Sequence, residues 1–438
     1  MASNNPTFKR VLVSGGGLAG PAIATLLARD GVDVTVIEIA DGVRPGGQAV
    51  DIRGAGRSVL SRMGLLDRAR EMMLRQHGIA DVDSRGRRRT EMTVEDFGGE
   101  GMVSEIEILR GDLAQLLVDA SVEAGASYVF GTRISSLVDG PDGVDVTLID
   151  GTELTVDLVI GADGPHSATR RLAFGPEEDF VHPAGGYMAW FTAPESATLH
   201  GWYQMFNAPG GLVASLRPGR EPGVAKASLS FASGPLAYDR HDIEAQRRLL
   251  NDRFAGVGWR VPDLLRAAGG ADDFYLDALV QVHMNSWARG RIALVGDAAY
   301  CPSPLTGLGT SLALVGAYVL AGELAARPDC GLAFAGYERI MRPYVDASQK
   351  LPPGGIRAYA PQSQRAIWAR WMSTRLMASR PLRGLTRRLF FSKAGAIDLP
   401  EYAPAAVRGA MTILDREPDP WASGLADAVP PQSLIQAC

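Results

Sequence analysis

A glycine-rich loop near the N-terminus has the residue types and spacing of a dinucleotide-binding site. The apolar run 10–14 leads directly into Gly15, Gly17 and Gly20, which form the pattern G-x-G-x-x-G. Gly15 permits a tight turn, Gly17 lets a pyrophosphate approach the backbone, and Gly20 lets a helix pack closely on a strand. The helix that follows would direct backbone N–H groups at the phosphates.

The acidic residue Glu38 stands where such a site binds ribose. A helix from about Gly17 to Asp30 and a strand from Asp33 to Ile39 follow the loop, which completes a βαβ unit. Glu38, at the end of this strand, would accept hydrogen bonds from a ribose hydroxyl. The pattern does not separate NAD from FAD, and a plain glycine-rich turn is the alternative.

A later loop, Pro304 to Gly309, could stabilise negative charge. An apolar helix follows it, so the backbone N–H groups of Leu308, Gly309 and Thr310 would lie at the N-terminus of that helix. A helix dipole at this point favours an anionic ring system without a titrating side chain. Glycines at 307 and 309 would let the ring edge come close.

Three segments together resemble the fingerprints of the flavoprotein aromatic hydroxylases, the family typified by para-hydroxybenzoate hydroxylase. They are the glycine loop, Gly161 to Arg170 with its Asp163-Gly164 turn, and Arg291 to Thr310 with Gly296-Asp297. The match extends from Arg10 to about Leu324. The resemblance implies that FAD is the cofactor, that Asp297 holds its ribityl chain, and that the Asp163-Gly164 turn supports the cofactor-binding region.

Two further stretches, 46–56 and 109–113, are similar to stretches of the tetracycline-inactivating monooxygenases and of related actinobacterial hydroxylases of natural-product pathways. In that family the arginine of the second stretch lies against the flavin, which implies the same position for Arg110. A charge exposed at the start of a helix is the alternative. The predicted FAD contacts are Gly15, Gly17, Leu18, Ala19, Gly20, Glu38, Gln48, Asp51, Arg53, Arg110, Asp163, Gly296, Asp297, Gly307, Leu308, Gly309 and Thr310.

The resemblance implies a monooxygenase whose chemistry belongs to the flavin. It further implies that NADH or NADPH would reduce FAD, that dioxygen would add at C4a, and that the hydroperoxide would transfer one oxygen atom to the substrate by hydroxylation or epoxidation. The substrate would be an aromatic or polycyclic, polyketide-like small molecule, such as a natural product or antibiotic. No second G-x-G-x-x-G follows a strand, so the nicotinamide cofactor would bind transiently, with Arg44 as a candidate contact.

The stretch between about Val181 and Val282 should contribute the substrate pocket. It alternates aromatic-rich segments with Gly and Pro turns, which predicts an antiparallel sheet inserted into the nucleotide-binding domain. This sheet should cover the flavin and exclude water. Each candidate could instead belong to the core of the sheet. The candidates are Trp190, Met205, Phe206, Lys226 and Phe231 from the sheet and Pro304 and Leu305 from the loop Pro304 to Gly309.

A few positions depart from the family patterns. Tyr300 stands where the family often has His, and Thr169 where Val is frequent. Gly211 and Lys226 stand where the tetracycline-inactivating enzymes place a substrate-contacting Arg and His. The resemblance therefore does not single out tetracycline as the substrate.

The predicted fold is α/β, with a Rossmann-like FAD-binding domain, an inserted, mainly antiparallel β-sheet substrate domain and a C-terminal helical region. The FAD-binding domain would comprise residues 1–75, 100–180 and 281–350, and the substrate domain residues 76–99 and 181–280. Bracing helices would follow at 351–410, where arginines recur without acidic residues between Arg357 and Lys393, and an irregular tail at 411–438. A basic helix on an anionic membrane is the alternative to bracing.

Composition excludes several classes of function. A chain of 438 residues with 46% hydrophobic residues and a net charge of −5 is typical of a soluble globular protein without a nucleic-acid partner. Three cysteines without ligand spacing predict a reducing compartment and no metal, with Cys301 as a packing residue; His182 and His283 are expected to be structural. No secretory signal is evident, and Ser311 to Ala326 is interpreted as a buried helix, so we expect a cytoplasmic monomer or homodimer without integral membrane association.

Rival interpretations share the nucleotide motifs. An FAD-dependent reductase or dehydrogenase of the same superfamily would not consume dioxygen stoichiometrically, and a flavoprotein that only sequesters a ligand would not show ligand-stimulated oxidation of NADPH. A flavin-dependent halogenase is disfavoured because its Trp-x-Trp-x-Ile-Pro segment is absent.

Overall fold

The computed structural model describes residues 8–44, 47–94, 96, 106–194, 199–379, 381 and 397–402. The chain divides into two compact units, Met1–Pro400 and Glu401–Cys438. Of the second unit only Glu401 and Tyr402 are described, so the predicted tail at 411–438 and Cys438 lie outside the described residues, as do Gly46 and part of the predicted bracing region.

The first sheet is six-stranded and carries the glycine loop. Its strand order is β17-β18-β11-β1-β2-β7, and its register is parallel except between β17 and β18. Buried apolar runs form these strands, as is usual where both faces of a parallel sheet are covered. Their bounds are β1 Arg10–Ser14, β2 Asp33–Glu38, β7 Ser127–Phe130, β11 Leu158–Gly161, β17 Ala288–Arg289 and β18 Ile292–Leu294.

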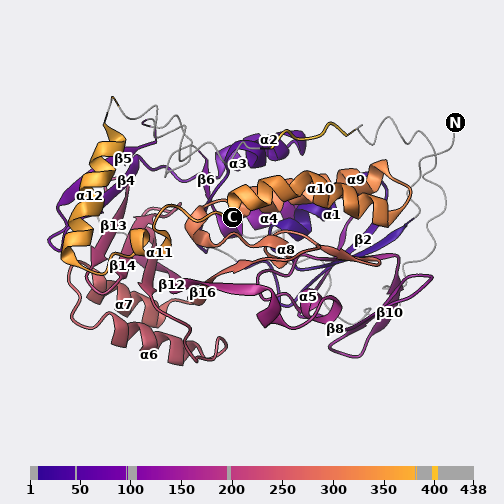
Figure 1. Cartoon of the computed structure of the whole chain (residues 1–438), viewed down its shortest axis with the longest axis horizontal. Helices are drawn as coiled ribbons and strands as arrows, with labels where there is room; N and C mark the ends of the chain where they lie inside the picture. The colour runs from indigo at the N-terminus through magenta and orange to yellow at the C-terminus, as the bar shows by residue number, and fades with distance from the viewer. Residues whose placement is uncertain are drawn as a thin grey trace. The chain divides into compact units, whose positions relative to one another are not determined.

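Several helices lie on one side of this sheet (Figure 1). Helix α1 (Ala19–Arg29) contacts both α4 (Arg110–Glu123) and α9 (Gly309–Ala326), and α9 also packs on α2 (Gly54–Arg62) and α10 (Cys330–Ser348). Among the described residues, α9 is the one helix long and apolar enough to cross a membrane. Its residues Thr310 to Leu324 are buried inside the unit, which makes α9 a core helix.

The second sheet is seven-stranded, in the order β16-β12-β15-β14-β13-β4-β5. All neighbours are antiparallel except β13 and β4. Strands β4 and β5 come from before residue 100, and the others from the stretch predicted to be inserted. The bounds are β4 Gly78–Val82, β5 Arg88–Thr93, β12 Val181–Pro194, β13 Trp202–Ala208, β14 Leu212–Pro218, β15 Val224–Ala232 and β16 Tyr275–Val282.

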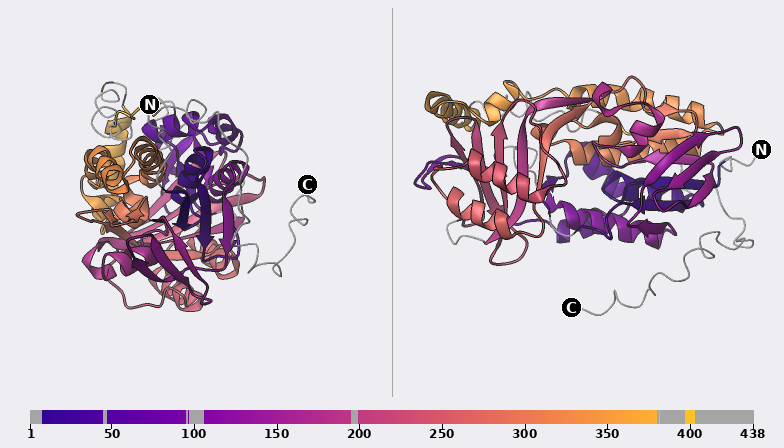
Figure 2. Two further views of the ribbon diagram at one scale, coloured as in Figure 1. Left: turned by 90° about the vertical axis from the view of Figure 1, so that its right-hand side faces the viewer. Right: turned by 90° about the horizontal axis from the view of Figure 1, so that it is seen from below.

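The two faces of the second sheet differ in character. Helices α6 (Ile243–Arg253) and α7 (Val261–Gly270) cover one face, as the right-hand view of Figure 2 shows, and the core there includes Phe191, Phe206 and Phe231. Because side chains alternate along a strand, the neighbouring positions Trp190, Lys226 and Ser228 point to the opposite face. That second face carries the polar side chains.

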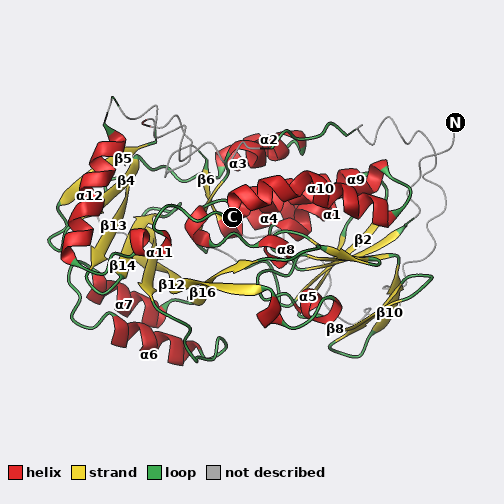
Figure 3. Ribbon diagram, in the orientation of Figure 1, coloured by secondary structure: helices red, strands yellow, loops and turns green. Residues whose placement is uncertain are grey.

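The remaining elements are short strands and helices beside the two larger sheets (Figure 3). Helix α12 (Gln364–Ala378) packs on β5 and β13, which places it as a brace on the seven-stranded sheet. The predicted α/β fold with an inserted antiparallel sheet and a helical C-terminal region is confirmed. The other bounds are β3 Ala49–Asp51, β6 Glu107–Leu109, β8 Ile134–Asp139, β9 Val144–Leu148, β10 Glu153–Val156, α3 Leu66–Glu71, α5 Ala168–Ala173, α8 Asp297–Tyr300, α11 Gly355–Tyr359, η2 Glu177–Asp179 and η3 Pro304–Thr306.

Candidate active site

The glycine loop forms the tight strand-to-helix connection that its spacing predicts. Gly15 has φ +113°, a conformation that favours glycine. A Cβ atom on Gly20 would lie only 1.9 Å from the Gly15 carbonyl oxygen, so no side chain fits there. The Glu38 carboxylate accepts hydrogen bonds from the backbone N–H groups of Gly16 at 2.7 Å and Ala40 at 2.9 Å. Leu18 and Ala19 then begin α1.

Arg110 lies next to this loop, although the two are far apart in sequence. Its backbone N–H donates to the Gln48 carbonyl oxygen at 2.9 Å, which fixes the start of α4 beside β3. Its guanidinium Nη2 would be 3.4 Å from a Cβ atom on Gly17. The missing side chain at Gly17 therefore leaves open space between the loop backbone and a cation.

The second predicted segment is a turn that is fixed internally. Asp163 accepts hydrogen bonds from the Thr169 backbone N–H at 2.9 Å, from the Thr169 hydroxyl at 3.0 Å and from the Ser167 hydroxyl. Arg170 is fully buried and donates to the Ala298 carbonyl oxygen at 2.9 Å. Arg170 thus ties the second segment to the third, a role that sequence reasoning missed.

The third segment places Asp297 close to Arg110 and to the N-terminus of α9. Gly296, at φ +67°, precedes the short helix α8, which Asp297 begins. Burial raises the pKa of the Asp297 carboxyl, and the positive charge of Arg110 opposes this rise. A Cβ atom on Gly309 would lie 3.8 Å from the Asp297 carboxylate, so the first turn of α9 adjoins this acid.

The loop Pro304 to Gly309 joins α8 to α9. Gly307 adopts a left-handed conformation at φ +65°, and a Cβ atom on it would lie 3.6 Å from the Asp51 carboxylate. Leu308 precedes the helix and Thr310 is buried in its first turn. Pro304 is exposed and Leu305 half-buried in the turn η3.

These residues fit a bound FAD. The glycine loop is a cradle that side chains at Gly15 or Gly20 would fill, and the N-terminus of α1 follows it. An acid, Glu38, ends β2, while Arg110, Asp297 and the N-terminus of the 18-residue helix α9 lie further along. The donors and acceptors are thus of the kinds that a pyrophosphate, a ribose and a polyhydroxyl chain require.

A small cavity lies between residues 47–49, at the start of β3, and the polar face of the seven-stranded sheet. From the first it is lined by Gly47, Gln48 and Ala49, and from the sheet by Trp190, Phe191, Tyr203, Ser215, Arg217, Lys226, Ala227 and Ser228. Two of the predicted pocket residues, Trp190 and Lys226, are among these. The others are not, and neither Pro304 nor Leu305 lines this cavity.

Comparison with known proteins decides the family. A family model described as FAD binding domain matches residues 9–329. A flavin-dependent monooxygenase of Legionella longbeachae is 41% identical over 342 residues, which cover 78% of this chain and 87% of that protein. An uncharacterized protein of Mycobacterium tuberculosis is 45% identical over 361 residues, covering 82% and 96% respectively. The crystal structure of tetracycline destructase Tet(51) matches with a TM-score of 0.76 at 32% identity, covering 91% of this chain and 100% of that one.

The chain belongs to the FAD-dependent monooxygenase family.

Three predicted pocket residues of this monooxygenase lie elsewhere in the sheet. Phe206 and Phe231 belong to the core beneath α6 and α7, on the face turned away from the cavity. Met205 is on the polar face but is buried in a separate cluster with Ile79 and Met92. The pleat explains the first two positions, because residues one apart on a strand face opposite sides of the sheet.

A buried charge cluster connects the two parts of the monooxygenase beside the cavity. The Arg53 guanidinium contacts the Asp51 carboxylate at 2.7 Å, and Asp51 lies opposite Glu107 in the β3–β6 pair. Glu107 accepts hydrogen bonds from Arg217 of β14 at 2.8 Å and from the Gln76 amide. Burial raises the pKa of Glu107 to about 8, although the positive charge of Arg217 opposes the rise. The one sequence signal for Glu107 was a charge within the apolar run 106–109.

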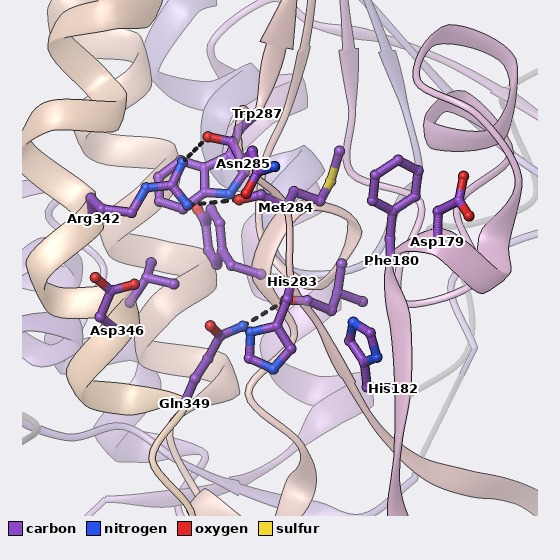
Figure 4. A pocket seen from close by; sticks show the side chains of 13 residues that line it. Asp179, Phe180, His182, His283, Met284, Asn285, Trp287, Arg342, Asp346 and Gln349 are labelled. Atoms are coloured by element: carbon purple, nitrogen blue, oxygen red, sulfur yellow. Dashed lines mark hydrogen bonds between the residues drawn. The ribbon is translucent and has the colours of Figure 1, made fainter.

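A second pocket, of about 430 Å³, lies away from the glycine loop and contains the two histidines expected to be structural (Figure 4). The rings of His182 and His283 are 5.4 Å apart. Burial and the neighbouring His182 lower the pKa of His283. Arg342 stacks on Trp287 at 3.8 Å and donates to the Met284 carbonyl oxygen. Across the described part of the chain, no group of three or more His, Cys, Asp or Glu side chains could hold a metal ion.

Two residues just before the loop Pro304 to Gly309 are packing residues. Cys301 is buried, and burial raises the pKa of its thiol well above the ordinary value, which disfavours a reactive thiolate. Tyr300, where the family often has His, is buried behind the loop and its hydroxyl accepts a hydrogen bond from the Tyr337 hydroxyl at 2.8 Å.

Proposed function

We propose that this protein uses NADH or NADPH and dioxygen to insert one oxygen atom into an aromatic or polycyclic small molecule, such as a natural product or antibiotic. The observation that carries the proposal is the cavity between Gln48–Ala49, next to the cofactor cradle, and the polar face of the inserted sheet. The names of similar proteins, a flavin-dependent monooxygenase and a tetracycline destructase, support the same reaction class.

Residues of this chain would hold FAD along its whole length. The glycine loop would receive the pyrophosphate, Glu38 the adenosine ribose, and Asp297 the ribityl hydroxyls, with Arg110 supplying positive charge between them. The backbone N–H groups at the start of α9 would stabilise negative charge on the ring. When bound, FAD would supply hydride acceptance from the nicotinamide and activation of dioxygen.

The inserted sheet would position the substrate and keep water out. Trp190 stacks on Tyr275 with ring centroids 5.9 Å apart, and Tyr203 lies under the Arg217 guanidinium at 4.0 Å, so aromatic surfaces line the sheet side. A dry cavity matters because water diverts activated oxygen to hydrogen peroxide. Among the described residues, one G-x-G-x-x-G loop follows a strand of the parallel sheet, and FAD would occupy it. The nicotinamide cofactor would therefore bind only transiently.

The test is a visible spectrum of the purified protein, followed by oxidation of NADH and NADPH and by oxygen uptake with a panel of polyketide, tetracycline and phenolic compounds. We expect a yellow protein whose oxygen uptake rises with one compound, and a product that carries one ¹⁸O atom from ¹⁸O₂. Oxidation of NADPH without an oxygenated product would favour a reductase or a sequestering flavoprotein. A protein that does not bind FAD would contradict the proposal.

A further inference from the structure

Helix α12 packs on the seven-stranded sheet with one face and exposes a row of apolar side chains on another. Ile367 and Thr374 are only 1% and 5% exposed. Trp368, Met372 and Leu376 are 60%, 42% and 60% exposed. They are four residues apart, so they form one row along the helix. The contact with the sheet therefore does not account for this row.

The composition of the row is that of a site that meets another surface. Single exposed apolar side chains are normal, but a contiguous row of large ones marks a site of interaction. Of the tryptophans that the structure describes, Trp368 is the most exposed. Tryptophan is enriched where a protein meets the headgroup level of a bilayer, because its ring is apolar and its N–H is polar.

Positive charge accompanies the row on α12 itself. The helix contains three arginines and no acidic residue, and no Asp or Glu occurs between Arg357 and Lys393. Arg365 is exposed and precedes Trp368 by three residues, which places it on the same side of the helix. Arg375 donates to the Arg89 carbonyl oxygen at 2.9 Å, and this neutral acceptor leaves its charge uncompensated.

The turn between β4 and β5 adds further arginines beside α12. The Arg89 guanidinium lies 5.7 Å from the Trp371 ring, and β5 is the edge strand of the sheet. Among the described residues, three carboxylates pair with the seven arginines of the helix and the turn, in a chain whose net charge is −5. The arginines are Arg85, Arg87, Arg88, Arg89, Arg365, Arg370 and Arg375, and the carboxylates are those of Asp81, Asp83 and Glu91. This patch is therefore locally positive.

An anionic lipid surface matches both features of the patch. Amphipathic helices that lie in a bilayer interface carry Trp and Leu toward the acyl chains and arginines toward the phosphates. A nucleic acid would leave Met372 and Leu376 without an apolar partner, and a second copy of this chain would bring the same positive charges together.

We propose that α12 docks this protein on an anionic membrane surface, with Trp368, Met372 and Leu376 inserted at the headgroup level and the arginines of the patch on lipid phosphates. The protein would bind peripherally, in the plane of the interface. The inference goes beyond the proposed oxidation and does not depend on it.

The test measures binding of the FAD-loaded, full-length protein to vesicles by co-sedimentation. Vesicles of phosphatidylcholine alone are compared with vesicles of equal parts of phosphatidylcholine and phosphatidylglycerol. We expect binding to the anionic vesicles to be at least about tenfold tighter and to weaken at high salt, because each arginine near such a surface contributes about fivefold. Phosphatidylglycerol vesicles with brominated acyl chains should also quench the tryptophan fluorescence of the unmodified protein.

Two variants locate the contact. Trp368→Gln should weaken binding about tenfold and remove most of the quenching. Arg365→Glu changes the local charge by two and should weaken binding to the anionic vesicles about 10- to 30-fold. Ile243→Gln, at a 46% exposed residue on α6, and Arg266→Glu, at an exposed arginine on α7, are the matched controls and should bind normally.

All four positions are exposed, and thermal unfolding checks that the variants fold. If they do not, the salt dependence and the bromine quenching still test the proposal on the unmodified protein. Equal affinity for the two kinds of vesicle, binding to neither, or binding that both α12 variants retain would overturn the inference. Self-association that Trp368→Gln abolishes, without binding to vesicles, would assign the row to a second copy of the chain and overturn it as well.

Discussion

Glu107 is a carboxyl that the fold buries next to a second carboxyl, and its protonation should couple to stability. Burial raises its pKa to about 8 from an ordinary 4.5. The unfolded chain loses this proton near pH 4.5, so the stability that the proton contributes is fully present below that pH and is lost as the pH rises through about 8.

Replacing Glu107 by Gln should therefore flatten the pH profile of the free energy of unfolding. Between pH ~5 and ~8.5 the unmodified protein should lose about 1–3 kcal/mol more than the variant does. Urea unfolding at a series of pH values measures this difference. Glu153→Gln, at an exposed glutamate, is the control. Parallel profiles for Glu107→Gln and the unmodified protein would show that Glu107 is ionised throughout.

Arg110 should contribute to cofactor affinity because its guanidinium lies over the space left by Gly17. Arg110→Gln removes a positive charge beside the expected pyrophosphate, and we expect the Kd for FAD to rise about 10- to 100-fold. Titration of the apoprotein with FAD, followed by flavin fluorescence, gives this Kd. Arg68→Gln, at an exposed arginine on α3, should bind FAD normally. Unchanged affinity in Arg110→Gln would assign Arg110 to the surface of α4.

At the scale of elements, helix α9 packs directly against the Tyr300 side chain at Gly316. A Cβ atom on Gly316 would lie 1.9 Å from the Tyr300 hydroxyl, so the helix has a glycine where that side chain packs. Alanine is favoured over glycine in a helix by about 1 kcal/mol. Overpacking costs about 1–3 kcal/mol and should win here.

Gly316→Ala should therefore destabilise the protein, by about 1–3 kcal/mol in urea unfolding. Adding Tyr300→Phe removes the clashing oxygen and should restore part of the loss, even though it deletes the hydrogen bond to Tyr337. Gly269→Ala on α7 meets no atom within 4 Å and serves as the control. A Gly316→Ala variant as stable as the control would mean that α9 shifts at no cost.

Local sequence patterns predicted the helices and strands well. They predicted poorly which face of a sheet each side chain occupies. The glycine loop, its flanking strands and α9 were predictable because glycine spacing and buried apolar runs are local signals. Phe206 and Phe231 were expected in the pocket but face the core under α6 and α7. Aromatic content does not say which face of a sheet a residue takes, since a shift of one residue reverses it.

Contacts that depend on the tertiary structure could not be predicted from the sequence. Asp163 was predicted as a cofactor contact, and the structure shows its carboxylate bonded to Ser167 and Thr169 of its own turn. The Glu107–Arg217 pair joins residues 110 positions apart, and neither residue lies in a motif. Lys226, by contrast, was found because an aligned position drew attention to it.

On the scale of the whole described unit, a few polar links join the seven-stranded sheet to the elements around the glycine loop. One joins Glu107, on β6 of the two-stranded β3–β6 sheet, to Arg217 of β14. Another starts at His166, in the turn after β11, whose imidazole lies 2.8 Å from the Glu177 carboxylate and 3.3 Å from that of Asp277 on β16. The expected cofactor site and the cavity lie between parts held by these links, so their strength should affect how firmly the sheets are held together.

The His166 link should respond to pH in a definite direction. Burial alone would lower the pKa of His166, but the hydrogen bonds to Asp277 and Glu177 outweigh it and raise the pKa to about 9 from 6.5. The stability that the link contributes is thus fully present below pH 6.5 and is lost as the pH rises through about 9.

His166→Gln should consequently destabilise the protein by about 1–2 kcal/mol at pH ~6 and by clearly less at pH ~9.5. Thermal and urea unfolding of both proteins at the two pH values measure the difference, and His241→Gln, at an exposed histidine, corrects for general effects. A loss that is equal at both pH values would mean that His166 acts only through packing. A loss confined to the lower pH would show that an imidazolium between two carboxylates joins the turn after β11 to the seven-stranded sheet.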